Sequence, residues 1–213
     1  MPESLKKLIS LIGYLPWIWE KSATKLAFFL LNTNKNFIEN LANSILTLKS
    51  SIDKCEKCWS LIDAWAWLCS ICKNTSRNQN LICVVEEYLD LIMIENSWVY
   101  KWVYHILWWA ISPMNGVFVW DLNFEKLFSR ISENNDKLEL IIATNPNIEW
   151  EATSMYIKSE IEKRWLKPFV KTTRLSRWLS SWYLEYADNI TLINSINERK
   201  EIVAYHRFRR KGI

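Results

Sequence analysis

The sequence has very little glycine and no long apolar run. Glycine accounts for 3 of the 213 residues, which is about 1.4% against a usual level of about 7%. Turn positions that need a positive φ must therefore be occupied mostly by residues that carry a Cβ. No run reaches the roughly 18 apolar residues of a membrane-spanning helix, and the N-terminal segment lacks the layout of a signal peptide. We therefore expect a soluble, cytoplasmic protein that binds no membrane.

Tryptophan is abundant where glycine is scarce. The chain has 14 Trp, and Trp108 and Trp109 stand side by side just before Ser112 and Pro113. A chain that leaves a strand usually has small residues at such a place. One interpretation is a core rich in aromatic side chains. The other is that many of these Trp are glycines in the natural protein.

Length and charge leave several classes of protein open. A chain of 213 residues is long enough for one large domain or two small ones. The net charge of +4 is mild. It permits nucleic acid as a partner without requiring it.

Residues 1–54 have the apolar spacing of helices, and a short link joins the first two. This link, Leu15-Pro16-Trp17-Ile18-Trp19, predicts a helical hairpin. With glycine at 17 and 19 it reads LPGIG, the hairpin of a helix-hairpin-helix element, in which the backbone approaches a DNA phosphate. Lys21 and Lys25 share a face of the next helix and could each neutralise a phosphate. The alternative is two solvated surface lysines.

Four of the five cysteines form two Cys-x2-Cys pairs, Cys55 with Cys58 and Cys69 with Cys72. Such pairs present four thiolates to one tetrahedral Zn²⁺ and leave no open position, so they predict one structural zinc ion and no catalytic one. A segment this short needs such a staple to hold its shape. The alternative is four reduced cysteines without metal. Cys83 lies within an apolar strand and is expected to be a small buried residue.

Strands and helices alternate from residue 80 to residue 175. This order predicts a parallel α/β sheet with helices on both faces and a ligand or partner site at the carboxyl ends of the strands, where Glu86 and residues 145–149 fall. A further helix is expected at 184–197. The expected strands are 81–86, 103–107, 138–144 and 170–175, and the expected helices are 88–95, 124–131 and 149–164.

The order of these parts resembles the RecR family of bacterial recombination mediators, and the resemblance extends to about Glu201. Its most specific stretches are 15–31, 82–95, 103–117, 143–157 and 184–192.

The resemblance implies a multi-part α/β protein. Its parts are a helix-hairpin-helix DNA-binding region at 1–54, a zinc motif at 55–72, a Toprim domain at 80–175, a C-terminal helical segment at 176–201 and a basic tail at 202–213.

The resemblance also implies a function without catalysis. The protein would bind duplex and gapped DNA without sequence preference, through the hairpin that holds Trp17, Trp19, Lys21 and Lys25. It would act with RecO, and in some pathways RecF, to help load RecA on gapped single-stranded DNA. A homo-oligomer, either a dimer or a tetramer, is implied as well.

The Toprim resemblance raises a rival function, an active Mg²⁺-dependent nuclease or primase-like enzyme. Catalytic members of that superfamily hold Mg²⁺ with a Glu after the first strand and an Asp-x-Asp after a later one. Glu86 matches the first position, but the second reads Asn145-Pro146-Asn147, which supplies too little charge. We therefore expect Glu86 and Glu149 to contact a partner protein. A zinc-bearing assembly protein without DNA affinity is a further alternative.

Many of the Trp coincide with glycines of the family pattern. Our hypothesis is that the gene comes from an organism that reads UGA as glycine, and that it was translated as though UGA meant tryptophan. The family typically has glycine at Trp17, Trp19, Trp98, Trp102, Trp109, Trp150, Trp178 and Trp182, and glycine is common at Trp108.

Overall fold

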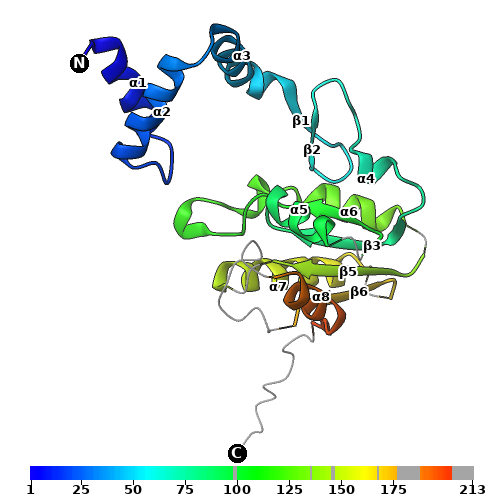
Figure 1. Ribbon diagram of the computed structural model, residues 1–213. Coiled ribbons are helices and arrows are strands. Elements are labelled where there is room, and N and C mark those ends of the chain that lie inside the picture. Colours follow the sequence, from blue (N-terminus) through cyan, green and yellow to red (C-terminus); the bar gives the residue numbers. More distant parts are fainter. Residues whose placement is uncertain (98–99, 135, 145–146, 167, 177–187, 203–213) are drawn as a thin grey trace, which may run out of the picture. The chain divides into compact units, whose positions relative to one another are not determined.

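The chain forms two compact units, Met1–Ser51 and Ile52–Ile213, and each is described by itself. Three of the Trp positions named above, 98, 178 and 182, lie outside the described residues, as does nearly all of the basic tail. The computed structural model describes residues 1–202 except 98–99, 135, 145–146, 167 and 177–187 (Figure 1).

The first unit consists of α1 (Glu3–Gly13), α2 (Glu20–Asn32) and α3 (Lys35–Ser51). Helices were expected throughout this region. Ala23 and Ala27 lie four residues apart on α2 and are fully buried, and a Cβ added to Gly13 would come within 3.9 Å of the Ala23 Cβ. Small residues allow α1 and α2 to pack closely, and this packing holds the two ends of the hairpin link together.

The second unit begins with a small module around the cysteines. It contains the antiparallel pair β1 (Ile52–Lys54) and β2 (Leu61–Asp63), followed by the short helix α4 (Ser70–Lys73). These strands were not predicted.

The second unit also contains one five-stranded sheet in the order β4-β3-β5-β6-β7. The first four strands are parallel and confirm the predicted alternation, whereas β7 pairs antiparallel with β6 and was not predicted. The strands are β3 (Asn78–Val85), β4 (Trp102–Ile106), β5 (Leu138–Ala143), β6 (Val170–Arg174) and β7 (Lys200–Glu201).

Helices cover both faces of this sheet, as expected. Successive side chains of a strand point to opposite faces, so Ile82 and Val84 of β3 join the core beneath α6 (Phe124–Ser132) and α7 (Ile148–Lys163). Cys83 and Val85 join the other core, beneath α5 (Tyr88–Asn96) and α8 (Asn189–Asn197). Cys83 is fully buried, as predicted. Two short 3₁₀ turns, η1 (Pro113–Asn115) and η2 (Val119–Asp121), lie between β4 and α6.

The C-terminal helix was expected from residue 184, but the described helix α8 begins at Asn189. The Asp188 carboxylate caps it by accepting the Thr191 N–H at 2.8 Å. Residues 184–187 lie outside the described part of the chain. None of the helices that the structure describes is long and apolar enough to cross a membrane.

The residues with a left-handed backbone conformation are unusual in type. Within the described ranges, the residues with a Cβ and a positive φ are Trp17 (66°), Trp59 (60°), Trp108 (72°) and Trp165 (59°). A single glycine, Gly116, shares this conformation with a φ of 74°. Tryptophan therefore occupies positions whose left-handed backbone normally favours glycine.

Candidate functional site

The four paired cysteines come together as the spacing predicted. The Sγ atoms of Cys55, Cys58, Cys69 and Cys72 all lie within 4.8 Å of one another, and all four residues are buried. A tetrahedral ion with metal–sulfur distances of about 2.3 Å would place the sulfur atoms about 3.8 Å apart. The Cys58 and Cys69 Sγ atoms are 3.5 Å apart. The site therefore fits a four-coordinate metal ion.

Backbone amides point at the sulfur atoms. The Cys69 N–H donates to the Cys55 Sγ and the Cys72 N–H donates to the Cys69 Sγ, each at 3.3 Å. Hydrogen bonds from the other three cysteines, Cys58 foremost, hold the pKa of the Cys55 thiol far below its usual value, and the same network raises the pKa of the Cys58 and Cys72 thiols. Donors aimed at sulfur favour the thiolate, which is the form that binds metal.

The cysteine module, which we call the knuckle (residues 55–72), covers an open edge of the sheet. Because β4 is the first strand in the sheet order, one side of it has no neighbouring strand among the residues that the structure describes. There the Ile106 N–H donates to the Cys58 carbonyl at 2.9 Å, and the Arg130 Nη1 of α6 donates to the Tyr104 carbonyl at 2.7 Å. These two edge groups, which could otherwise pair with another chain, therefore have partners.

The two glutamates expected to meet a partner lie on different elements at the carboxyl end of the sheet. Glu86 follows β3 and is half-buried, and its carbonyl accepts the Trp108 N–H at 2.8 Å. Glu149 lies in the first turn of α7. Its carboxylate accepts the Ser112 Oγ at 2.5 Å and the Asn115 Nδ2 at 3.3 Å. Glu149 therefore anchors the link that follows β4, and its contact with a partner stays a prediction.

The neighbouring polar residues also have structural partners. Asn147 is the N-cap of α7, where its Oδ1 accepts the Trp150 N–H at 2.8 Å. Glu151 pairs with Arg174 at 2.9 Å. Asn145 and Pro146 lie outside the described residues. Among the residues that the structure describes, the four cysteines are the one group of His, Cys, Asp or Glu side chains close enough together to hold a metal ion. The described residues at this edge of the sheet therefore include no carboxylate cluster for Mg²⁺.

Asp90 is a titratable residue that the sequence reasoning missed. It forms a capping box at the start of α5, where its carboxylate accepts the Glu87 N–H at 2.9 Å. Burial raises the pKa of Asp90 to about 7, and the negative charges of Glu86 and Glu87 act in the same direction. An acidic pair spaced as Glu87 and Asp90 at the start of a predicted helix was the available signal.

The hairpin of the first unit exposes the residues predicted to meet DNA. Trp17 and Trp19 are 95% and 81% exposed, and Lys21 and Lys25 are exposed on the first turns of α2. The carbonyl of Trp19 accepts the N–H groups of Ser22 and Ala23 at 2.8 and 2.9 Å, which begins the helix immediately after the link.

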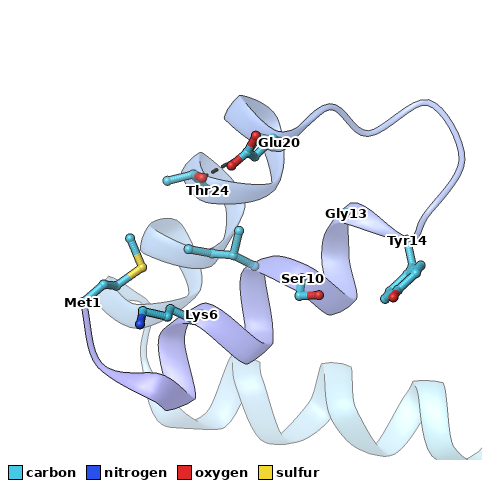
Figure 2. A pocket seen from close by; sticks show the side chains of 8 residues that line it. Met1, Lys6, Ser10, Gly13, Tyr14, Glu20 and Thr24 are labelled. Carbon is cyan, nitrogen blue, oxygen red and sulfur yellow. Dashed lines mark hydrogen bonds between the residues drawn. The ribbon is translucent and has the colours of Figure 1, made fainter.

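A pocket of about 500 Å³ lies beside α1 and α2. Lys6 and Ser10 of α1 line it together with Glu20 and Thr24 of α2 (Figure 2). The Thr24 hydroxyl donates to the Glu20 carbonyl at 2.9 Å. Tyr14 and Glu20, at the two ends of the link, also line this pocket (Figure 2), so the pocket lies beside the predicted DNA contact.

Removal of one cysteine tests the metal centre. Cys58→Ser should lose the metal and loosen the knuckle, because three thiolates no longer complete the tetrahedron. Elemental analysis should find one zinc per chain in the unchanged protein and a clear deficit in the variant, which should also aggregate more readily as the β4 edge opens. Cys83→Ala is the control and should retain its zinc. A full complement of zinc in Cys58→Ser would contradict the assignment.

The raised pKa of Asp90 predicts a pH dependence of stability. Between about pH 4 and about pH 7 the folded protein holds a proton on Asp90 that the unfolded chain has lost, so this group lowers stability as the pH rises. Asp90→Asn removes the ionisation but keeps an oxygen for the Glu87 N–H. Urea unfolding should show that, as the pH rises across this range, the free energy of unfolding of the variant increases relative to that of the unchanged protein by a few kcal/mol in total. The exposed control Asp63→Asn should not gain, and a flat difference for Asp90→Asn would contradict the prediction.

The chain is similar to known proteins over most of its length. Residues 80–175 match the Toprim domain family. The chain is 38% identical over 202 residues to the recombination protein RecR of Herpetosiphon aurantiacus, which covers 94% of this chain and 96% of that protein. It is 39% identical over 199 residues to the recombination protein RecR of Dehalococcoides mccartyi, covering 92% and 94% of the two chains. With this identity over almost the full length of both relatives, the chain belongs to the RecR family.

Proposed function

We propose that this protein is a DNA-binding recombination mediator. It works with RecO, and in some pathways with RecF, to help RecA load onto gapped single-stranded DNA. The relatives' name, recombination protein RecR, supports the recombination role. The observation that carries the DNA-binding part is the exposed hairpin, with two lysines at its exit.

Lys21 and Lys25 are suited to phosphate contacts. They lie four residues apart on α2 (Glu20–Asn32), so they share one face of the helix beside the link. The N-terminal amides of a helix attract the same anion. Contacts of this kind involve only the DNA backbone, so binding is independent of sequence and weakens with salt.

The protein is proposed to be no enzyme. Asn147 caps α7 and Glu149 is engaged by Ser112, so two residues near the expected Mg²⁺ position already have structural partners. We propose that the knuckle holds one Zn²⁺. Four thiolates leave that ion no open position for a substrate.

A homo-oligomer, dimer or tetramer, is part of the proposal. No residue of the 17-residue helix α3 is buried, although apolar side chains recur on it at helical spacing. Exposed apolar stripes of this kind are typical of interfaces. The exposed apolar residues of α3 include Phe37, Ile38, Leu41, Ile45 and Leu48.

The acidic edge of the sheet is proposed as the contact for the RecO-type partner. Glu86 and Glu149 supply negative charge at the carboxyl ends of the strands, where partner sites of parallel sheets usually lie.

Charge reversal at the hairpin tests DNA binding. The double variant Lys21→Glu, Lys25→Glu should lose affinity for gapped DNA, because it replaces two phosphate contacts with repulsion. The slope of log affinity against log salt should fall by about 1 for each lysine. Gel-shift titrations at several salt concentrations measure both quantities.

The matched control is Lys101→Glu, Lys137→Glu, which makes the same charge change at two exposed lysines of the second unit. It should retain most of the affinity. Light scattering should give all three proteins the same mass, larger than that of one chain. Equal affinity in the hairpin variant and the control would refute the role of Lys21 and Lys25.

A further inference from the structure

We propose that positions 17, 59, 108 and 165 are glycine in the protein that its own cell makes. In the part of the chain that the structure describes, these four Trp are the residues that combine a Cβ with a left-handed backbone. Among residues other than glycine, Asn and Asp are the ones usually found in this conformation. Trp makes up 14 of 213 residues, so four such positions would all fall on Trp by chance with a probability on the order of 10⁻⁵.

Trp165 occupies the glycine position of a helix C-terminus. The Leu166 N–H donates to the Ile161 carbonyl at 3.0 Å, and the Trp165 N–H donates to the Glu162 carbonyl at 3.2 Å. This nested pair of hydrogen bonds after α7 is a Schellman motif, whose left-handed residue is most often glycine. A Cβ is strained there.

Trp17 occupies the glycine position of a turn. The Ile18 N–H donates to the Leu15 carbonyl at 3.3 Å, which closes a four-residue turn with Pro16 second and Trp17 third. Proline at the second place and a positive φ at the third is the pattern of a type II turn, in which the third residue is usually glycine and sometimes asparagine.

Trp59 lies in the tight turn of the knuckle. Its N–H donates to the Cys55 carbonyl at 2.9 Å, and the Cys55 N–H donates to the Ser60 carbonyl at 2.8 Å. The resemblance to the family places glycine at positions 17 and 108 but not at positions 59 and 165. At 59 and 165 the inference of glycine therefore rests on the backbone conformation alone.

A buried tryptophan adds to the argument. Trp102, where the family has glycine, is 3% exposed, and its Nε1 finds no hydrogen-bond partner among the described residues. A buried indole N–H normally has one. UGA codons read as glycine account for the excess of Trp and the shortage of Gly together.

Two measurements test this inference. The codons at the four positions should be UGA, and UGG there would overturn it. Trp165→Gly should also melt higher than Trp165→Ala by about 2–4 °C, because both variants remove the indole but only glycine removes the Cβ. The control Trp120→Gly, at an exposed position with ordinary backbone, should show no such gain over Trp120→Ala. Equal melting of the two Trp165 variants would overturn the backbone argument.

A second observation, independent of the first, concerns Arg130. We infer that Arg130 is a positioning residue of the metal centre, whose positive charge offsets the negative charge of the four thiolates around a bound zinc ion.

Arg130 reaches the knuckle from α6. It is 8% exposed, and its Nη1 donates to the Tyr104 carbonyl on the edge of β4. Its buried Nη2 has no partner among the residues that the structure describes. A pocket of about 320 Å³ is lined by Arg130 together with Glu56, Lys57 and Leu68 of the knuckle.

The charges explain why a buried cation is tolerated here. Burial lowers the pKa of Arg130, whereas the negative charges of the four cysteines, Cys72 foremost, act in the opposite direction. Four thiolates around one Zn²⁺ leave a net charge of about −2 in a buried place. A buried cation and a buried anion each cost folding energy alone, and each is tolerated in the presence of the other.

Zinc affinity measured by competition with a chelator tests this role. Arg130→Met keeps the bulk of the side chain but removes its charge, and it should weaken zinc binding by about 10–100-fold. Arg130→Lys keeps the charge and should recover most of the affinity. Arg199→Met is the control, since it removes a partly buried arginine paired with Glu139 and should leave zinc affinity unchanged. Unchanged affinity in Arg130→Met, or the same loss in Arg199→Met, would overturn the inference.

Discussion

The open edge of β4 is the constraint on which the second unit depends. A parallel sheet that ends on an unpaired strand exposes a row of backbone donors and acceptors. Here the Cys58 carbonyl accepts the Ile106 N–H, and Arg130 donates to the Tyr104 carbonyl. The knuckle can cover this edge only while its four cysteines hold their shape. The four-cysteine site is therefore coupled to the integrity of the Toprim domain.

The carboxyl end of the same sheet is occupied in a similar way. Glu149 anchors the link after β4, Asn147 caps α7, and Asp90 caps α5. Polar groups at the place where such sheets usually bind ligands are thus engaged in holding helices and turns. Because these groups already have structural partners, we propose a function without metal-dependent chemistry. The surface that we propose for DNA is the exposed hairpin of the first unit.

Much of the fold followed from local pattern, and the exceptions have physical reasons. The four parallel strands and the clustering of the four paired cysteines were predictable because apolar periodicity and cysteine spacing are local signals. The strands β1, β2 and β7 have only two or three residues each, too few for periodicity to appear. The docking of the knuckle on β4 joins residues 48 positions apart, Cys58 and Ile106, and no local pattern encodes it. The structural partners of Glu149 were missed for the same reason, since Ser112 lies on a distant link.

We propose that the protein binds DNA through phosphate contacts and performs no chemistry on it. The most direct test incubates the unchanged protein with gapped DNA at several salt concentrations, with and without Mg²⁺, and examines both binding and the DNA itself. We expect an affinity that falls steeply with salt and DNA that stays intact under all conditions. Strand cleavage or extension that requires Mg²⁺ and disappears in Glu86→Gln would contradict it, as would binding that is absent at low salt.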